Sequence, residues 1–161
     1  MPNQPGTTGT DLPPSIHAIL AHTGKQRSLL RHEPVRNIVR SGIAGVQLAV
    51  NLTSYRSLPL SCLEGLLLKV DGEDMDVSDA RLLLNGHEYR FTALPALSHL
   101  WWFILDPGAI FVPRAQPLSP GSHQFDATLI TVEPYVTAGR FSFYHADRRE
   151  LTVADEEGAR K

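Results

Sequence analysis

The residues from Val46 to Ser61 constrain the fold more than any other stretch of the chain. Apolar residues occupy every second position from Val46 to Leu52, and smaller or polar residues lie between them. A strand with one buried face requires this alternation, because successive side chains leave opposite faces of the pleat. The alternation stops before Tyr55 and Arg56, and Pro59 lacks the amide N–H that a central strand needs. The stretch therefore predicts a half-buried strand that ends at a sheet rim or at a surface that meets another molecule.

Turn signals between strand-like runs extend this reading to the rest of the chain. Asp71-Gly72 and Asn85-Gly86 are strong hairpin signals, because glycine readily adopts the positive φ that tight turns need. A longer alternating run from 125 to 132 predicts a long strand, and no long amphipathic helix is evident. We predict an all-β, antiparallel sandwich or barrel-like single domain over residues 29–153. A flexible N-terminal arm (1–28) and a solvated tail (154–161) are expected to flank it.

The segment from Ala93 to Leu105 contains no charged residue. We expect its second half, Trp101 to Leu105, to form a strand that pairs with, or bends into, residues 109–112. Adjacent residues on a strand face opposite sides, so Trp101 and Trp102 cannot both enter one core. One of the two indoles is therefore expected on a second surface, where tryptophan is typical of protein interfaces and sugar-stacking sites.

Composition excludes several classes of function. The chain has 161 residues, of which 42% are hydrophobic and 20% charged, as in ordinary globular proteins. Its net charge of −2 gives no basic footprint for nucleic acid, and its single cysteine, Cys62, excludes an internal disulfide. We expect Cys62 to be a buried structural thiol. Neither a signal peptide nor a membrane-spanning run is evident, which predicts a cytoplasmic protein.

A search for catalytic or metal-binding motifs finds none that is complete. The seven histidines are scattered, without the spacing of a zinc site. The aspartates between Asp71 and Asp79 resemble a calcium loop but lack its glycine and its terminal glutamate. No serine lies in the Gly-x-Ser-x-Gly context of an esterase nucleophile. We therefore predict no catalytic, cofactor-binding or metal-binding residue in this chain.

Several segments taken together resemble a known family. The most distinctive is YRSLPLS from Tyr55, followed by LEGLLLKVDGE from Leu63. Arg81 with Leu83, the Trp102-Phe103 pair, LSPGSH from Leu118 and ELTV from Glu150 occur in the same order. Over residues 29 to 153 the chain resembles the β subunit of bacterial C-glycoside deglycosidases.

This resemblance implies a β-sandwich subunit of a two-subunit lyase. The partner of such a subunit is an α subunit similar to sugar-isomerase (TIM) barrels, which carries a divalent, manganese-like metal and the acid–base residues. The implied substrate is a 3-oxo-C-glycoside of a flavonoid or anthraquinone, cleaved by elimination at the carbon–carbon bond between the sugar and its aromatic aglycone. The β subunit would pack on the barrel and stabilise it without being catalytic itself.

The residues expected to contact the partner are Tyr55, Arg56, Pro59, Trp101 and Trp102, and Trp102 matches the family best. Two other classes of function stay open on the residues alone. A free-standing carbohydrate-binding module would stack Trp101 or Trp102 on a sugar. A cupin-like metal enzyme would need histidines that are distant in sequence to converge in the fold.

Overall fold

The alternating stretch at Val46 forms the strand that the sequence predicts. In a computed structural model, which describes residues 28–54, 56–132 and 142–154, β2 runs over Ile43–Val50. Val46, Leu48 and Val50 are buried on its inner face, and Leu52 continues the buried row past the end of the strand. β3 (Leu58–Pro59) ends at the proline, and a 3-10 turn, η1 (Leu60–Cys62), follows it. Cys62 is buried, as predicted.

Three hairpins have two-residue turns that end in glycine. Asp71-Gly72 joins β4 (Leu63–Val70) to β5 (Glu73–Asp74), and Asn85-Gly86 joins β6 (Arg81–Leu84) to β7 (His87–Arg90). Ser41-Gly42 joins β1 (Arg36–Arg40) to β2. Both residues of each turn have positive φ, the geometry that matches the twist of the flanking strands. The hairpins predicted at residues 71–72 and 85–86 are therefore confirmed.

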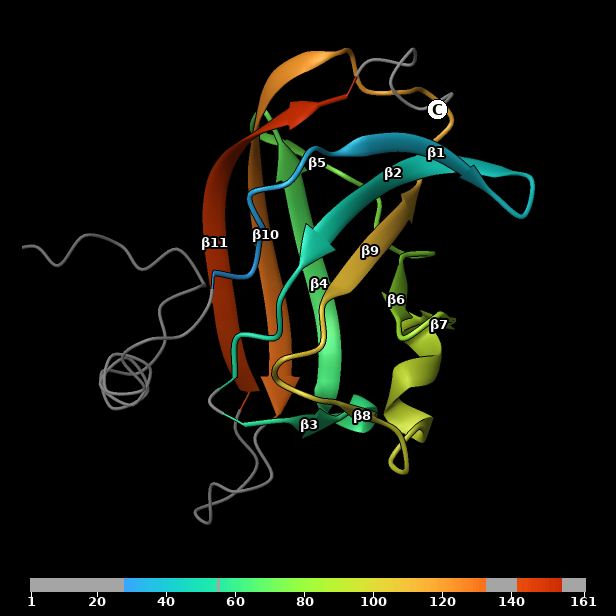
Figure 1. Cartoon of the computed structure of the whole chain (residues 1–161), viewed down its shortest axis with the longest axis vertical. Coiled ribbons are helices and arrows are strands. Elements are labelled where there is room, and N and C mark those ends of the chain that lie inside the picture. Colours follow the sequence, from blue (N-terminus) through green and yellow to red (C-terminus); the bar gives the residue numbers. More distant parts are fainter. Residues whose placement is uncertain (1–27, 55, 133–141, 155–161) are drawn as a thin grey trace, which may run out of the picture.

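The strands assemble into two antiparallel sheets and a short ribbon (Figure 1). One sheet has the order β1-β2-β9-β6-β7, where β9 is Gly108–Pro113. The other has the order β11-β10-β4-β5, where β10 is Gly121–Val132 and β11 is Ser142–Val153. The ribbon pairs β3 with β8 (Trp101–Trp102), and a second 3-10 helix, η2 (Phe91–Ala96), precedes it. The all-β architecture is as predicted.

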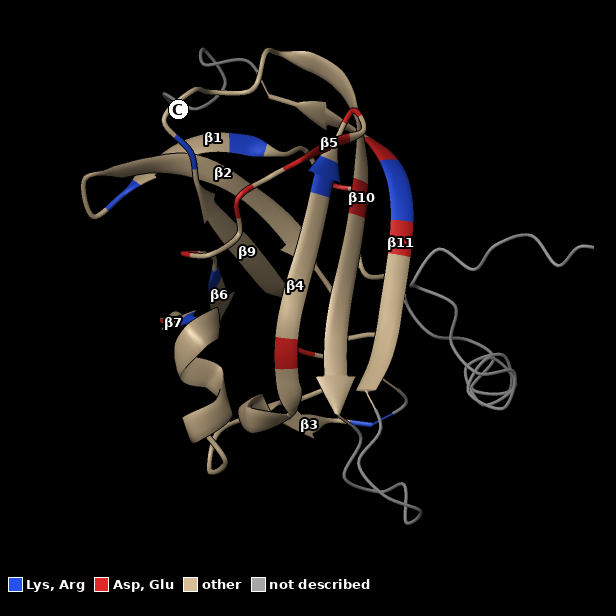
Figure 2. Cartoon of the chain, turned by 180° about the vertical axis from the view of Figure 1, so that it is seen from behind, with Lys and Arg blue, Asp and Glu red and all other residues tan. Residues whose placement is uncertain are grey.

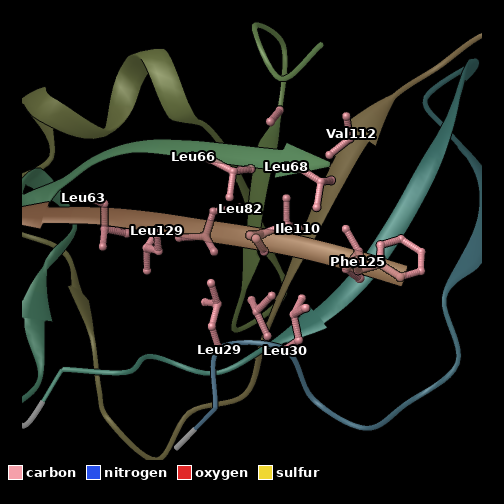
Figure 3. Close-up of a cluster of buried hydrophobic side chains, with 14 of the residues drawn as sticks. Leu29, Leu30, Leu63, Leu66, Leu68, Leu82, Ile110, Val112, Phe125 and Leu129 are labelled. Carbon is pink, nitrogen blue, oxygen red and sulfur yellow. The ribbon is translucent and has the colours of Figure 1, made fainter. Parts of the chain in front are cut away.

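The core lies between the inner faces of the two sheets. Figure 3 shows Leu66, Leu68 and Leu129 from one sheet close to Leu82 and Ile110 from the other. The segment before β1 closes one side of the sandwich. Its Leu30 bridges to Val50, and its Val35 bridges to Val153 on the opposite sheet. This segment buries Leu29 and Leu30 completely, so it is part of the core that holds the two sheets together.

Two strand predictions need correction. The strand expected from Trp101 to Leu105 stops at Trp102, and its partner is β3 rather than residues 109–112. The chain turns after Trp102, where the amide of Asp106 donates to the carbonyl of Phe103 (2.9 Å). The sequence also favours two separate strand segments near the end of the domain, at 141–144 and 151–153. The described residues of both belong to one continuous strand, β11. Among its central charges, Arg148 and Glu150 are exposed, and Arg148 Nε lies 2.5 Å from Asp126 Oδ1 on β10. Asp147 is half-buried and accepts a hydrogen bond from the Leu30 amide (2.9 Å).

Charges on the outer face of the β11-β10-β4 sheet gather toward its β5 end (Figure 2). There Lys69, Asp126 and Arg148 form one cross-strand row. No helix of the described residues is long and apolar enough to cross a membrane. The predicted arm and tail lie outside the described residues, apart from Ser28 and Ala154.

Candidate functional site

The ribbon β3–β8 brings together the two segments that the sequence singled out. Leu58 pairs with Trp102 and Pro59 with Trp101. The pairing continues on both sides, because the amide of Leu60 donates to the carbonyl of Leu100 (2.8 Å). At the other end, the amide of Ile104 donates to Ser57 Oγ (2.9 Å). Residues 57–60 and 100–104 therefore form one unit at the end of the sandwich, which we call the ribbon.

Trp102 belongs to the core. Its side chain is 1% exposed, and its indole Nε1–H donates to the carbonyl of Asp106 (2.9 Å). A Cβ on Gly108 would lie 2.8 Å from the Trp102 ring, so glycine is required for this close approach. A side chain this buried offers no surface to a partner, so the core accounts for Trp102. Of the tryptophan pair we keep only Trp101 as an interface residue.

The opposite face of the ribbon and the turn after it carry exposed apolar side chains. Trp101 is 40% exposed, Phe103 56% and Leu105 71%. Among the described residues, three of the six large exposed apolar side chains thus lie within five residues of sequence. Contiguous exposed apolar surface marks interaction sites, whereas single apolar residues on a surface are ordinary. We call Trp101, Phe103 and Leu105 the apolar edge.

Hydrogen bonds hold the backbone of the turn that carries the apolar edge. Besides the Ile104–Ser57 and Asp106–Phe103 bonds, Asn85 Nδ2 donates to Asp106 Oδ2 (3.1 Å) and so ties the turn to the β6–β7 hairpin. A surface that is held in one conformation loses little entropy when it binds.

The other predicted interface residues lie beside the ribbon. Arg56 is exposed and Pro59 is half-buried, directly across from Trp101. Tyr55 lies outside the described residues. The structure thus places Arg56, Pro59 and Trp101 at one end of the fold. Their contact with a partner remains a prediction.

A polar site lies at the end of β4 that is farther from the ribbon, and sequence reasoning missed it. His123 Nδ1 lies 2.6 Å from Asp71 Oδ2, and its Nε2 lies 2.7 Å from the carbonyl oxygen and 3.2 Å from the hydroxyl of Ser119. The amide of Gln124 also donates to Asp71 Oδ1 (2.9 Å). Asp71 belongs to the VDGE motif and His123 to the LSPGSH motif, so two of the segments that carry the family resemblance meet here.

The Asp71–His123–Ser119 group has the connectivity of a catalytic triad but not its protonation. The hydrogen bond to Asp71, and then that to the Ser119 carbonyl, raise the pKa of His123 above its ordinary value. The hydrogen bond from His123, and then that from the Gln124 amide, lower the pKa of Asp71. Because the Asp71 carboxylate and the Ser119 carbonyl oxygen are both acceptors, both ring nitrogens of His123 are placed to donate, which is not the arrangement in which Nε2 accepts a proton from Ser119. The group fastens two loops together.

The calcium-like aspartates are divided among separate structural roles. Asp71 binds His123, Asp74 lies 3.9 Å from Lys69, and Asp76 accepts hydrogen bonds from the amide and hydroxyl of Ser78. Across the described ranges, no three His, Cys, Asp or Glu side chains are grouped so that they could hold a metal ion.

Arg81, one of the residues that carry the family resemblance, has a structural role. Its guanidinium lies 5.9 Å from the centre of the Phe111 ring, and Nη1 lies 2.5 Å from Glu88 Oε1. Phe111 points away from the main core, because its neighbours Ile110 and Val112 point inward, yet it is fully buried. Arg81 covers this ring, and Arg40 lies 3.7 Å from the same glutamate.

Comparison with known proteins agrees with these motifs. A family model described as C-glycoside deglycosidase beta subunit matches residues 25–135. A 3'-dehydrocarminate deglycosidase beta subunit of a Microbacterium species is 31% identical over 70% of this chain and 86% of its own length. A C-glycoside deglycosidase beta subunit of Arthrobacter globiformis is 36% identical over 74% of this chain and 91% of its own. The corresponding subunit of Microbacterium trichothecenolyticum is 29% identical over 62% and 76%. The chain therefore belongs to the C-glycoside deglycosidase beta subunit family.

Proposed function

We propose that this chain is the non-catalytic β subunit of a C-glycoside deglycosidase, and that its apolar edge packs on the catalytic subunit. Family membership supports the subunit role, and the relatives are themselves named as beta subunits of deglycosidases. The observation that carries the docking surface is the cluster of exposed Trp101, Phe103 and Leu105 on a turn held by hydrogen bonds.

The partner in this proposal is a sugar-isomerase-like TIM barrel that holds a divalent, manganese-like metal and the acid–base residues. Its substrate is a C-glycoside already oxidised to the 3-keto sugar. The ketone acidifies the proton on C2, so a base in the barrel can remove it. The electron pair of the C2–H bond then forms the C1–C2 double bond. The aglycone leaves with the electron pair of the C1–aryl bond and takes up a proton.

In this proposal, the role of the chain is to pack on the catalytic subunit and stabilise it. Aromatic and aliphatic side chains at the centre of an interface account for most of its binding energy when they are fully desolvated. Trp101, Phe103 and Leu105 have the exposure and the fixed geometry for that position. Arg56, at the same end, is placed to extend the contact with a polar rim.

The test is assembly with the barrel subunit from the same organism. We expect the two chains to co-elute in size-exclusion chromatography and to cleave a 3-oxo-C-glycoside only together. Leu105→Asp should abolish co-elution, because it buries an unpaired carboxylate at the interface. The matched control is Val39→Asp, which places the same charge at a site of similar exposure on the β1–β2 hairpin and should leave the complex intact.

Arg56→Ala provides a milder probe, and we expect it to weaken assembly more than it weakens folding. Full turnover by this chain alone, or full activity of the barrel without it, would refute the proposed role. Equal co-elution of the Leu105→Asp and Val39→Asp variants with the barrel would move the docking surface away from the apolar edge.

A further inference from the structure

A groove of about 330 Å³ lies beside the ribbon, where residues 99–103 face the β6–β7 hairpin. Five of its nine lining residues carry a ring: His87, Tyr89, His99, Trp101 and Phe103. They come from two separate segments of the chain, one on β7 and one around β8. The groove volume is at the small end of the range of about 300–1,000 Å³ that is typical of ligand pockets.

The chemistry of this groove differs from that of the larger groove near His123. None of its nine lining residues is Asp, Glu, Lys or Arg. The larger groove, of about 730 Å³, is lined by four acidic residues and Arg114. Ligand pockets of the first kind, with rings and a few polar groups, select flat apolar molecules and orient them by single hydrogen bonds.

The rings of the groove are held in place by the fold. The backbone at Trp101 is fixed by its pairing with Pro59, and the backbone at Phe103 by the turn that Asp106 closes. Tyr89 is half-buried against the core, and the centre of its ring lies 6.2 Å from that of His87. The backbone segments that carry the stacking rings are therefore ordered before any ligand arrives, which lowers the entropic cost of binding.

We propose that this groove binds a planar, hydroxylated aromatic ring system. Trp101 and Phe103 supply ring faces or edges for stacking, and the imidazoles of His87 and His99 supply hydrogen-bond partners for phenolic hydroxyls. A sugar fits the groove less well. Its many hydroxyls need several polar partners, and Asn85, the one amide side chain in the wall, already donates to Asp106.

In the reaction, the ligand would be the aromatic part of the substrate, and that assignment rests on the proposed function. The binding itself is a property of this chain. Leu105 is part of the apolar edge but does not line the groove, so partner contact and ligand contact can be separated by substitution.

The experiment titrates the full chain with a dihydroxyflavone and, separately, with methyl glucoside, followed by calorimetry and by NMR of the Trp101 indole N–H. We expect saturable one-to-one binding of the flavone with a shift of the Trp101 signal, and no binding of the glucoside. His99→Ala and Trp101→Ala should each raise the flavone Kd about fivefold, the loss expected for one hydrogen bond at His99 and for one aromatic contact at Trp101. Leu105→Ala is the matched control and should leave the flavone Kd unchanged.

Absence of flavone binding, equal binding of the glucoside, or a flavone Kd that neither variant changes would overturn the inference. Because His99 is exposed, its variant tests the groove without loss of a core contact. Measurements on the free wild-type chain separate the two proposals. If the free chain binds flavone but never binds the barrel, the subunit role fails and the groove remains. If the chain binds the barrel but the free chain does not bind flavone, the groove fails and the subunit role remains.

Discussion

The two ends of β4 lie beside surfaces of opposite character, one polar and one apolar. The strand has eight residues, so its ends are roughly 25 Å apart. At the turn end, polar groups bind one another, and the hydrogen bond to Asp71 raises the pKa of His123. At the ribbon end, apolar residues continue from the core onto the surface, with Trp102 inside and Trp101 outside. The polar groups of the turn end bind one another within the chain, whereas the ribbon end has apolar surface that the described residues leave exposed.

Each end also has a histidine with a shifted pKa, and the two shifts have opposite signs. His145 lies on β11 beside Thr131, which pairs with Leu63 at the ribbon end of β4. Burial lowers the pKa of His145 to about 4. The pKa of His123 at the turn end is raised by its carboxylate partner. Burial near the ribbon thus favours the neutral form of His145, and the carboxylate at the turn end favours the charged form of His123.

Replacement of Trp102 should have the largest effect on stability. Trp102→Ala removes a fully buried indole and its hydrogen bond to Asp106, and should lower the free energy of unfolding by about 3–5 kcal/mol. Urea denaturation of the full chain measures this change. Trp101→Ala is the matched control, one residue away on the opposite face, and should cost less than about 1 kcal/mol. Equal losses for the two variants would remove the distinction between the inner and outer faces of the ribbon.

Lowering the pH should destabilise the fold through protonation of His145. Because the pKa of His145 is lower in the folded state than in the unfolded chain, its stabilising contribution is complete above pH 6.5. That contribution is lost as the pH falls from 6.5 to about 4, and the loss is on the order of 3 kcal/mol. His145→Gln keeps an amide group near Thr131 without a titrating ring, so its stability should vary less over this range. An unchanged acid limb in this variant would assign the pH dependence to other groups.

Local signals in the sequence account for most of the sheet. The alternation from Val46 predicts the buried face of β2, and paired turn residues predict two hairpins, because both features depend on neighbouring residues. The same pleat argument predicts that one of Trp101 and Trp102 is exposed, although not which one. The orientation depends on which residue packs on Gly108, six positions away from Trp102 and without a side chain of its own.

The remaining features depend on contacts between distant residues. Asp71 and His123 are 52 positions apart, so no local pattern predicts their hydrogen bond. β11 is continuous because β10 pairs with it along its whole length, and its charged middle gives no strand signal by itself. The early end of β8 has the same origin, since β3 offers it only two residues. In each case the partner strand decides the structure.

Gly108→Ala tests how tightly the inner face of the ribbon is packed. The added methyl would lie 2.8 Å from the Trp102 ring, so the ring or the backbone must move, at a cost of about 1–3 kcal/mol. The cost should fall in a Trp102→Leu background, because the smaller side chain leaves room for the methyl. A double-mutant cycle from urea denaturation measures this coupling. Strict additivity of the two substitutions would show that the close approach contributes nothing to the stability of the ribbon.

The smallest effect is expected at the turn end, where Asp71→Asn removes the charge but keeps the shape. The carboxylate is the main cause of the raised pKa of His123, so that pKa should fall toward 6.5 in the variant, as measured by NMR titration. In the wild-type protein the pair stabilises the fold between the lowered pKa of Asp71 and the raised pKa of His123. Its contribution is lost as the pH rises through the pKa of His123 or falls through the pKa of Asp71.

The matched control is Asp74→Asn, which makes the same charge change on the same hairpin. Asp74 interacts with Lys69, so this variant should leave the pKa of His123 nearly unchanged. Equal shifts in the two variants would mean that the net charge of the hairpin, rather than the Asp71–His123 hydrogen bond, sets that pKa.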